Sequence, residues 1–227
     1  MKHILTYHTL FENENMEQYT PSTKTIISGG EIILSKDKNA PLLMVYGGIP
    51  VKGITSGVYM WNYVDKLKEK YHIFVASSHK VNGPDTYETV LTYLKKYGIA
   101  PSKKVLYLFS GGYSPGMKLL DTKAADFSKV LLVDIWMKGK TISDFYIKFT
   151  NNNKAKVEYY YTSFGANNDS ARDAIAKSAG VVNTKSNHMD TNLLAADSLI
   201  KMYNYTLNLP TNNVFFQAID MKKGGKI

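Results

Sequence analysis

Residues 105–116 read Val-Leu-Tyr-Leu-Phe-Ser-Gly-Gly-Tyr-Ser-Pro-Gly, an apolar run followed by a glycine-rich turn. The run from Val105 to Phe109 is apolar at every position, which is typical of a central parallel strand covered on both faces. The residues after it contain G-x-S-x-G, with Ser114 at the centre. A nucleophilic serine on a sharp turn from strand to helix crowds the positions two before and two after it, so both must be small. The stretch therefore predicts a strand, a tight turn and a helix.

Strand and helix patterns alternate on both sides of this stretch. The expected strands cover Leu42–Tyr46, His72–Ala76, Lys129–Trp136 and Val157–Phe164, with an edge strand at Glu31–Leu34 and a short last strand from Val181. The expected helices cover Val58–Tyr71, Asp85–Tyr97, Ser170–Ala179 and Thr191–Tyr203. Strands of this length alternating with helices imply βαβ crossovers and a mainly parallel sheet with helices on both faces. The sequence thus predicts a three-layer α/β sandwich.

The 227 residues fit one domain of this class. Residues 1–25 are polar and weakly patterned, and we interpret them as an N-terminal arm or a peripheral hairpin. Residues 26–227 contain no internal repeat and no linker-like composition, and no segment is long enough for a large cap domain. We therefore expect a single α/β domain with an open, shallow site.

Charge and cysteine content exclude several function classes. The chain has 28 Lys+Arg against 19 Asp+Glu, a formal net charge of +9, yet Arg172 is the only arginine. Base and phosphate recognition favours the guanidinium fork, and the lysines are scattered, so a nucleic-acid partner is not expected. Because cysteine is absent, the chain has no disulfide, no thiol nucleophile and no thiolate-ligated metal. No zinc-ligand spacing and no phosphate-loop motif occurs either, so we expect neither a metal nor a cofactor.

Neither a leader peptide nor a membrane span is predicted. The residues from Met1 to His8 become polar within a few positions, unlike the apolar core of a signal peptide. No stretch approaches the ~20 consecutive apolar residues that a membrane-spanning helix needs. We expect a soluble protein, either cytoplasmic or associated with a virion.

Three residue types needed for nucleophilic catalysis follow successive expected strands. Ser114 comes after the strand at 105–109, Asp169 follows the strand at 157–164, and His188 follows the strand that begins at Val181. The carboxyl ends of parallel strands share one edge of the sheet, where reactive groups collect. A serine needs a base to accept its proton and a buried carboxylate to orient that base.

Other residues compete for two of these roles. Asp134 ends the strand at 129–136 and is the main alternative carboxylate, although Asp169 is preferred. Asp169 could instead serve only as the N-cap of the helix that follows it. His79 is the one competing histidine at the same edge, because it follows the strand at 72–76.

At these residues the chain resembles the α/β-hydrolase superfamily, in which serine, acid and histidine follow successive strands in this order. The resemblance covers about residues 42–203. The elbow, Gly111-Gly112-Tyr113-Ser114-x-Gly116, looks most like that of cutinases and phage lysin B-type serine esterases. The resemblance implies an ester substrate, small or polymeric, that is cleaved through an acyl-enzyme. It also implies a backbone oxyanion donor from Gly48 or Ile49, after the strand at 42–46.

Pro115 departs from that pattern. The second oxyanion donor is normally the N–H of the residue after the nucleophile, and proline has none. Losing one such donor costs roughly 3–4 kcal/mol of transition-state stabilisation. Three interpretations stay open: Ser114 acts with a differently built hole, Ser110 is the nucleophile, or the fold is a catalytically inactive binding or structural module, such as a phage-particle protein. The difficulty for Ser110 is that Leu108 would occupy a position that should be small.

Overall fold

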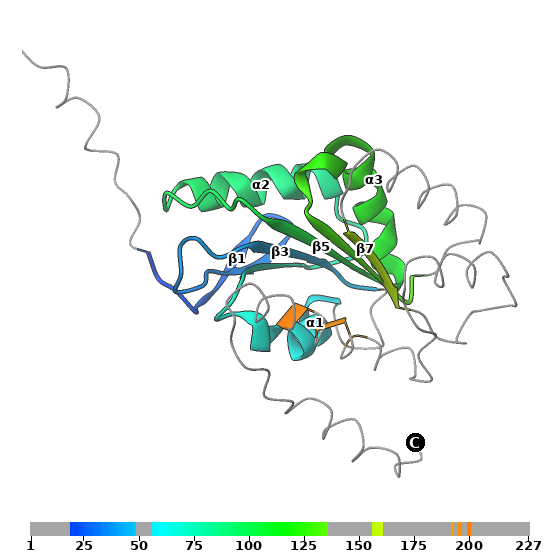
Figure 1. Cartoon of the computed structure of the whole chain (residues 1–227), viewed down its shortest axis with the longest axis horizontal. Coiled ribbons are helices and arrows are strands. Elements are labelled where there is room, and N and C mark those ends of the chain that lie inside the picture. Colours follow the sequence, from blue (N-terminus) through cyan, green and yellow to red (C-terminus); the bar gives the residue numbers. More distant parts are fainter. Residues whose placement is uncertain are drawn as a thin grey trace, which may run out of the picture.

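The computed structural model describes residues 19–48, 56–135 and 156–160, and five helical residues farther along: 192, 195, 196, 199 and 200. Within these residues seven strands form one sheet in the order β1-β2-β4-β3-β5-β6-β7 (Figure 1). β2 runs antiparallel to both β1 and β4, and all other neighbours are parallel. The strands are β1 (Lys24–Ile27), β2 (Gly30–Ile33), β3 (Leu42–Tyr46), β4 (His72–Ala76), β5 (Lys104–Phe109), β6 (Lys129–Val133) and β7 (Lys156–Tyr160). The helices are α1 (Ser56–Val64), α2 (Gly83–Lys95) and α3 (Tyr113–Lys123), with 3-10 turns η1 (Asp65–Leu67), η2 (Ser110–Gly112) and η3 (Ala124–Asp126).

Helices cover both faces of the sheet. In Figure 1, α2 and α3 lie on one face, and α1 lies on the other together with the described helical residues from 192 to 200. Leu106 and Leu108 of β5 pack toward α2 and α3, whereas Tyr107 and Phe109 pack toward α1 and Leu199. The predicted three-layer α/β sandwich with a mainly parallel sheet is confirmed.

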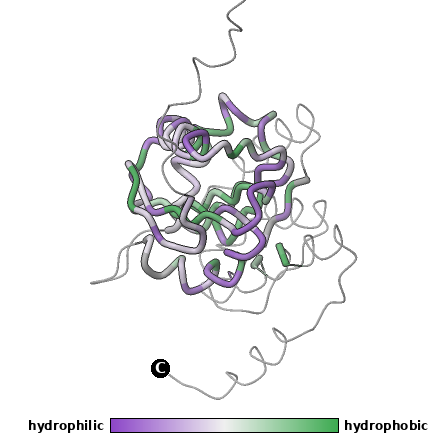
Figure 2. Tube along the Cα trace, turned by 90° about the vertical axis from the view of Figure 1, so that its left-hand side faces the viewer, coloured by the Kyte–Doolittle hydropathy of each residue, from purple (hydrophilic) through white to green (hydrophobic). Residues whose placement is uncertain are grey.

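The strand sequences account for this arrangement. Every residue of β3, β4 and β6 is buried, which is why these strands are apolar at consecutive positions instead of alternating. Figure 2 shows the hydrophobic strands near the centre of the molecule and hydrophilic segments mostly around them. One buried ion pair interrupts the apolar layer, with Lys129 Nζ 2.8 Å from Glu158 Oε1.

Two sequence predictions need correction at the start of the sheet and in the first helix. The expected edge strand is β2, but it lies inside the sheet, because β1 pairs with its outer side. β1 begins at Lys24, so the last residues of the segment interpreted as an arm or a peripheral hairpin do belong to a hairpin. The helix expected over 58–71 ends at Val64 and continues only as the turn η1.

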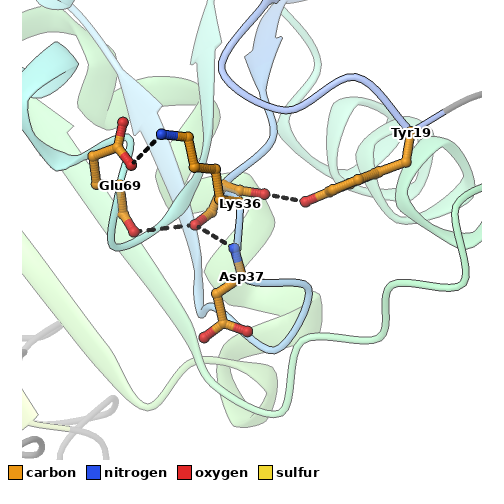
Figure 3. Close-up of polar contacts among 5 residues, drawn as sticks. Tyr19, Lys36, Asp37 and Glu69 are labelled. Atoms are coloured by element: carbon orange, nitrogen blue, oxygen red, sulfur yellow. Dashed lines mark hydrogen bonds and ion pairs between the residues drawn. The ribbon is translucent and has the colours of Figure 1, made fainter.

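Polar contacts tie down the loop between β2 and β3 at the amino-terminal edge of the parallel strands (Figure 3). Ser35 Oγ donates to the Glu69 carbonyl oxygen at 3.2 Å and accepts from the Asp37 N–H at 3.2 Å. The Tyr19 hydroxyl donates to the Ser35 carbonyl oxygen, and Lys36 Nζ lies 3.6 Å from Glu69 Oε2. This loop lies at the opposite end of β3 and β4 from the carboxyl edge that holds the candidate site.

Candidate active site

Ser110 occupies the turn between β5 and α3. β5 ends at Phe109, and Ser110 adopts φ +49° before the chain enters α3 at Tyr113. A positive φ is uncommon for a residue other than glycine and costs roughly 1–2 kcal/mol. Sharp strand-to-helix turns of this kind expose a nucleophilic serine above the sheet, and strained residues cluster at functional sites. Ser110 therefore lies, with a positive φ, at a strand-to-helix turn, the position that a nucleophilic serine takes in such elbows.

Ser114, the serine at the centre of G-x-S-x-G, lies inside the helix. It is the second residue of α3, and its side chain is exposed. Pro115 is the third residue, in the first turn, where the backbone N–H groups have no intrahelical acceptor. A proline is tolerated there because it removes a donor that the helix does not use. The strand-to-helix turn thus precedes Ser114 by one helical turn.

Two glycines allow the elbow to pack against its neighbours. A Cβ at Gly112 would lie 2.1 Å from the Tyr46 carbonyl oxygen, so only glycine permits α3 to start this close to the end of β3. A Cβ at Gly116 would lie 2.1 Å from Leu108 Cδ2. An elbow at Ser110 needs space that a small residue at position 108 would leave. Here Gly116 leaves that space instead, because it has no side chain next to Leu108. This contact answers the steric difficulty that Leu108 poses for Ser110.

The end of β3 lies level with the elbow. Tyr46 pairs with Leu108 in the parallel register, so buried Gly48, which follows β3, and Ser110, which follows β5, leave the sheet at the same edge. Ile49, the other oxyanion candidate, lies outside the described residues. The Tyr46 side chain lies on the face of the sheet that α2 and α3 cover, and its hydroxyl donates to the Gly83 carbonyl oxygen at 3.3 Å. Burial raises the pKa of Tyr46, so the phenol stays a neutral donor that joins β3 to the start of α2.

Asp134 is the first residue after β6, as Ser110 is the first residue after β5. Phe109 pairs with Val133, so the two residues follow the last paired positions of adjacent strands. Asp134 is only 3% exposed and also has a positive φ, +40°. Its N–H donates to the Tyr160 carbonyl oxygen at 2.6 Å, which connects this turn to the end of β7. Asp169 and His188 lie outside the described residues.

His79 also follows a strand at this edge, but it is farther from the elbow. It comes three residues after β4, and β3 separates β4 from β5. Its Nδ1 atom is buried and makes no hydrogen bond within the described part of the chain. The described ranges contain no group of three or more His, Asp or Glu residues placed to hold a metal ion. No helix among them has the length and apolar character to cross a membrane.

Known proteins resemble this chain in structure only. No protein-family model and no curated protein matches its sequence. FphF, a fluorophosphonate-binding serine hydrolase from Staphylococcus aureus, matches with a TM-score of 0.54 at 12% identity, over 80% of this chain and 97% of its own. Est1E from Butyrivibrio proteoclasticus matches with a TM-score of 0.53 at 10% identity, over 81% and 99%. The esterase domain of a Rhodothermus marinus protein matches with a TM-score of 0.52 at 11% identity, over 75% and 89%.

This chain has the α/β-hydrolase fold. The resemblance predicted from the order of strands and site residues is confirmed at the level of the fold. In this α/β-hydrolase fold the turns after β3, β5 and β6 bring Gly48, Ser110 and Asp134 to one edge of the sheet. None of the three matched proteins is described as a cutinase or a phage lysin. That narrower resemblance stays a prediction from the residues around Ser114.

The sequence motif and the backbone conformation point to different serines. G-x-S-x-G drew attention to Ser114, while the strained turn falls at Ser110. The signal that could have located the turn is Pro115, because a proline so close after a strand marks the first turn of a helix. The turn must then lie before it, at the residues directly after Phe109.

Proposed function

We propose that this protein is a serine hydrolase of ester bonds with Ser110 as its nucleophile. The observation that carries the proposal is the positive φ of Ser110 in the turn between β5 and α3, beside the end of β3. The fold supports the reaction class by analogy only, since a fold hosts many functions. The local geometry at Ser110 is an argument independent of that analogy.

The proposed reaction has two halves. Ser110 Oγ attacks the ester carbonyl and gives its proton to His188, and the imidazolium then protonates the leaving alcohol as the acyl-enzyme forms. Water attacks the acyl-enzyme, His188 takes a proton from it, and the proton returns to Ser110 as the carboxylic acid leaves. A buried carboxylate keeps the imidazole in the correct tautomer throughout.

Choosing Ser110 removes the difficulty that Pro115 creates. The residue after the nucleophile is then Gly111, which has an N–H to donate to the oxyanion. The second donor would be the N–H of Gly48 or Ile49, which follow β3 at the same edge of the sheet as Ser110. Ser114 would require an oxyanion hole without its usual second donor, from within a helix.

Asp134 is the carboxylate that the described geometry supports. It is buried and one strand away from Ser110, and its turn is held by the hydrogen bond to Tyr160. Asp169, the carboxylate preferred from the sequence, stays a prediction from residue order. Substituting each carboxylate in turn decides between them.

Hydrolysis of a short-chain p-nitrophenyl ester tests the function directly. We expect the wild-type protein to hydrolyse the ester and Ser110→Ala to lose activity by ~10³-fold or more. Ser114→Ala, a change of the same size one helical turn away, should keep activity within about twofold. If Ser114→Ala alone lost activity, Ser114 would be the nucleophile, and the resemblance to the cutinase elbow would be supported. A wild type inactive on short and long acyl esters would favour a non-catalytic module.

A further inference from the structure

Lysines that are scattered along the sequence come together at the amino-terminal edge of the parallel strands. Four segments form this edge, since each leads into a parallel strand: residues 34–41, 65–71, 95–104 and 124–128. We call these four segments the basic edge, because they contain nine lysines and four carboxylates. The lysines are Lys36, Lys38, Lys66, Lys68, Lys70, Lys95, Lys96, Lys103 and Lys104, and the carboxylates are Asp37, Asp65, Glu69 and Asp126.

Hydrogen bonds hold the segments of the basic edge next to one another. The contacts of Ser35 join the first segment to the second. Lys38 Nζ donates to the Tyr97 carbonyl oxygen at 3.3 Å, which joins the first segment to the third. The Ser128 N–H donates to the Lys104 carbonyl oxygen at 2.9 Å, which joins the third to the fourth. The basic edge is therefore one continuous surface, and the four strand spacings from β2 to β6 give it a width of about 19 Å.

The two edges of the sheet differ in charge. At the opposite edge, the described turns after β3, β4, β5 and β6 contain one lysine, Lys80, and one carboxylate, Asp134. The basic edge has an excess of five lysines over carboxylates. Among the described turns, the excess positive charge therefore lies at the edge away from Ser110.

Helix ends explain only part of this arrangement. Lys95 and Lys96 lie at the end of α2, where cations complement the partial negative charge of the helix. Lys103 and Lys104 lie where β5 begins, and neither forms an ion pair within the described ranges. The lysines at the start of β5 therefore have a different role from the lysines that cap the helix.

The types of side chain favour anionic lipid headgroups over nucleic acid as the partner. Every cation of the basic edge is lysine, a hydrated point charge that suits attraction to a charged layer, whereas base recognition favours arginine. Three tyrosines also cluster at this edge. The ring centroid of Tyr97 lies 6.0 Å from that of Tyr19 and 5.3 Å from that of Tyr93, and the last two residues are half-buried. Tyrosine is enriched where lipid headgroups meet water.

We propose that the basic edge docks on a membrane surface that contains anionic phospholipids. The lysines attract the headgroups, and the tyrosines lie at the level of the headgroups. The opposite edge, with Ser110, then faces the solution. This proposal does not depend on the proposed function, because no residue of the basic edge takes part in that reaction.

Co-sedimentation of the full chain with vesicles tests the proposal. We expect the protein to bind vesicles of phosphatidylcholine with about one-third phosphatidylserine at low salt, and not to bind vesicles of phosphatidylcholine alone. Binding should weaken as salt is added, since the Debye length falls to about 8 Å at physiological ionic strength. The double variant Lys95→Gln/Lys103→Gln should bind about 25-fold more weakly, because each lysine near a charged surface contributes about fivefold.

The matched control is the double variant Lys80→Gln/Lys118→Gln. It has the same net charge as Lys95→Gln/Lys103→Gln, and all four lysines are exposed, so both variants should fold with a Tm near that of the wild type. Lys80 lies at the opposite edge and Lys118 within α3, so the control should bind the vesicles within about threefold of the wild type.

The outcomes separate a docking surface from net charge. Binding that is lost in the first variant and kept in the control would support the proposal. No binding to the phosphatidylserine vesicles at low salt, or equal losses in the two double variants, would overturn it. Tighter binding to duplex DNA than to the vesicles at the same salt would also overturn it, and would assign the basic edge to nucleic acid.

Discussion

Ser110 and Asp134 are the first residues beyond the paired ends of β5 and β6, and both have a positive φ. Two neighbouring strands thus end in the same uncommon conformation, at +49° and +40°, at one edge of the sheet. Each such residue costs roughly 1–3 kcal/mol and persists only when its surroundings hold it. At Ser110 the surroundings are the contacts of Gly112 and Gly116, and at Asp134 they include the hydrogen bond to Tyr160. In the proposed reaction these two strained residues are the nucleophile and the carboxylate.

Asparagine at position 134 should abolish the proposed ester hydrolysis while preserving the turn. Asparagine also tolerates positive φ, so Asp134→Asn keeps the backbone and removes only the charge. We expect kcat to fall by up to ~10⁴-fold, the effect of a neutral partner that leaves the imidazole in the wrong tautomer. The matched variant Asp169→Asn should stay within about tenfold of the wild type. Steady-state ester hydrolysis measures both, and the reverse ranking would assign the carboxylate role to Asp169.

Alanine at position 116 should destabilise the protein through its contact with Leu108. The added methyl would lie 2.1 Å from Leu108 Cδ2, and overpacking of this kind costs about 1–3 kcal/mol. Leu108→Ala should cost about 2–5 kcal/mol by itself. In the double variant the two changes compensate, so the loss in the free energy of unfolding should be clearly smaller than the sum.

The control for the double-mutant cycle of positions 108 and 116 is Gly57→Ala. Its Cβ would lie 3.5 Å from the Ala76 carbonyl oxygen, an ordinary contact, so the change should be neutral or slightly stabilising. Urea unfolding of the wild type, the three variants at positions 108 and 116, and Gly57→Ala gives the free energies. Additive losses at positions 108 and 116 would refute the idea that Gly116 makes room for Leu108.

The stability of the fold should fall in mild acid because of His72. This side chain is fully buried, accepts a hydrogen bond from the Ser35 N–H at 3.1 Å through Nδ1, and has Nε2 3.3 Å from the Lys38 carbonyl oxygen. Burial lowers the pKa of His72, although the contact with Lys38 and the charge of Asp37 act in the opposite direction. The folded protein therefore binds a proton less readily than the unfolded chain, whose histidine pKa is about 6.5.

The sign of the pH effect follows from this difference. The contribution of His72 is fully present above pH ~6.5 and is lost as the pH falls toward the folded pKa, with a slope of at most about 1.4 kcal/mol per pH unit. We expect urea unfolding between pH 5.5 and 7.5 to show this loss in the wild type. His72→Gln, which is less stable overall, should show a flatter profile. Parallel profiles for the two proteins would contradict the assignment.

The sequence predicted the sheet well where both faces of a strand are apolar. β3 and β4 have the predicted bounds, because each is buried at every position and ends at polar residues or glycine. β1 was harder to recognise, since its residues are alternately exposed and half-buried and Ile26 is 82% exposed. An edge strand pairs with a neighbour on one side alone. Its sequence therefore shows little hydrophobic pattern from which it could be predicted.

The candidate site could be predicted as a region but not residue by residue. The order of strands predicts which turns meet at the carboxyl edge, and Ser110 and Asp134 were both among the candidates. The choice between the two serines depends on where α3 begins, and on a contact between Leu108 and Gly116 that brings β5 and α3 together. Such packing depends on the tertiary structure. The G-x-S-x-G motif around Ser114 carries no information about it.

The most direct test of the account is to find which residue an active-site-directed fluorophosphonate modifies. The reagent phosphonylates a serine only where a base activates it and an oxyanion hole receives the phosphonyl oxygen. Peptide mass spectrometry of the labelled protein should place the adduct on Ser110, with labelling abolished in Ser110→Ala and retained in Ser114→Ala. An adduct on Ser114, or labelling that survives Ser110→Ala, would contradict the assignment of the nucleophile.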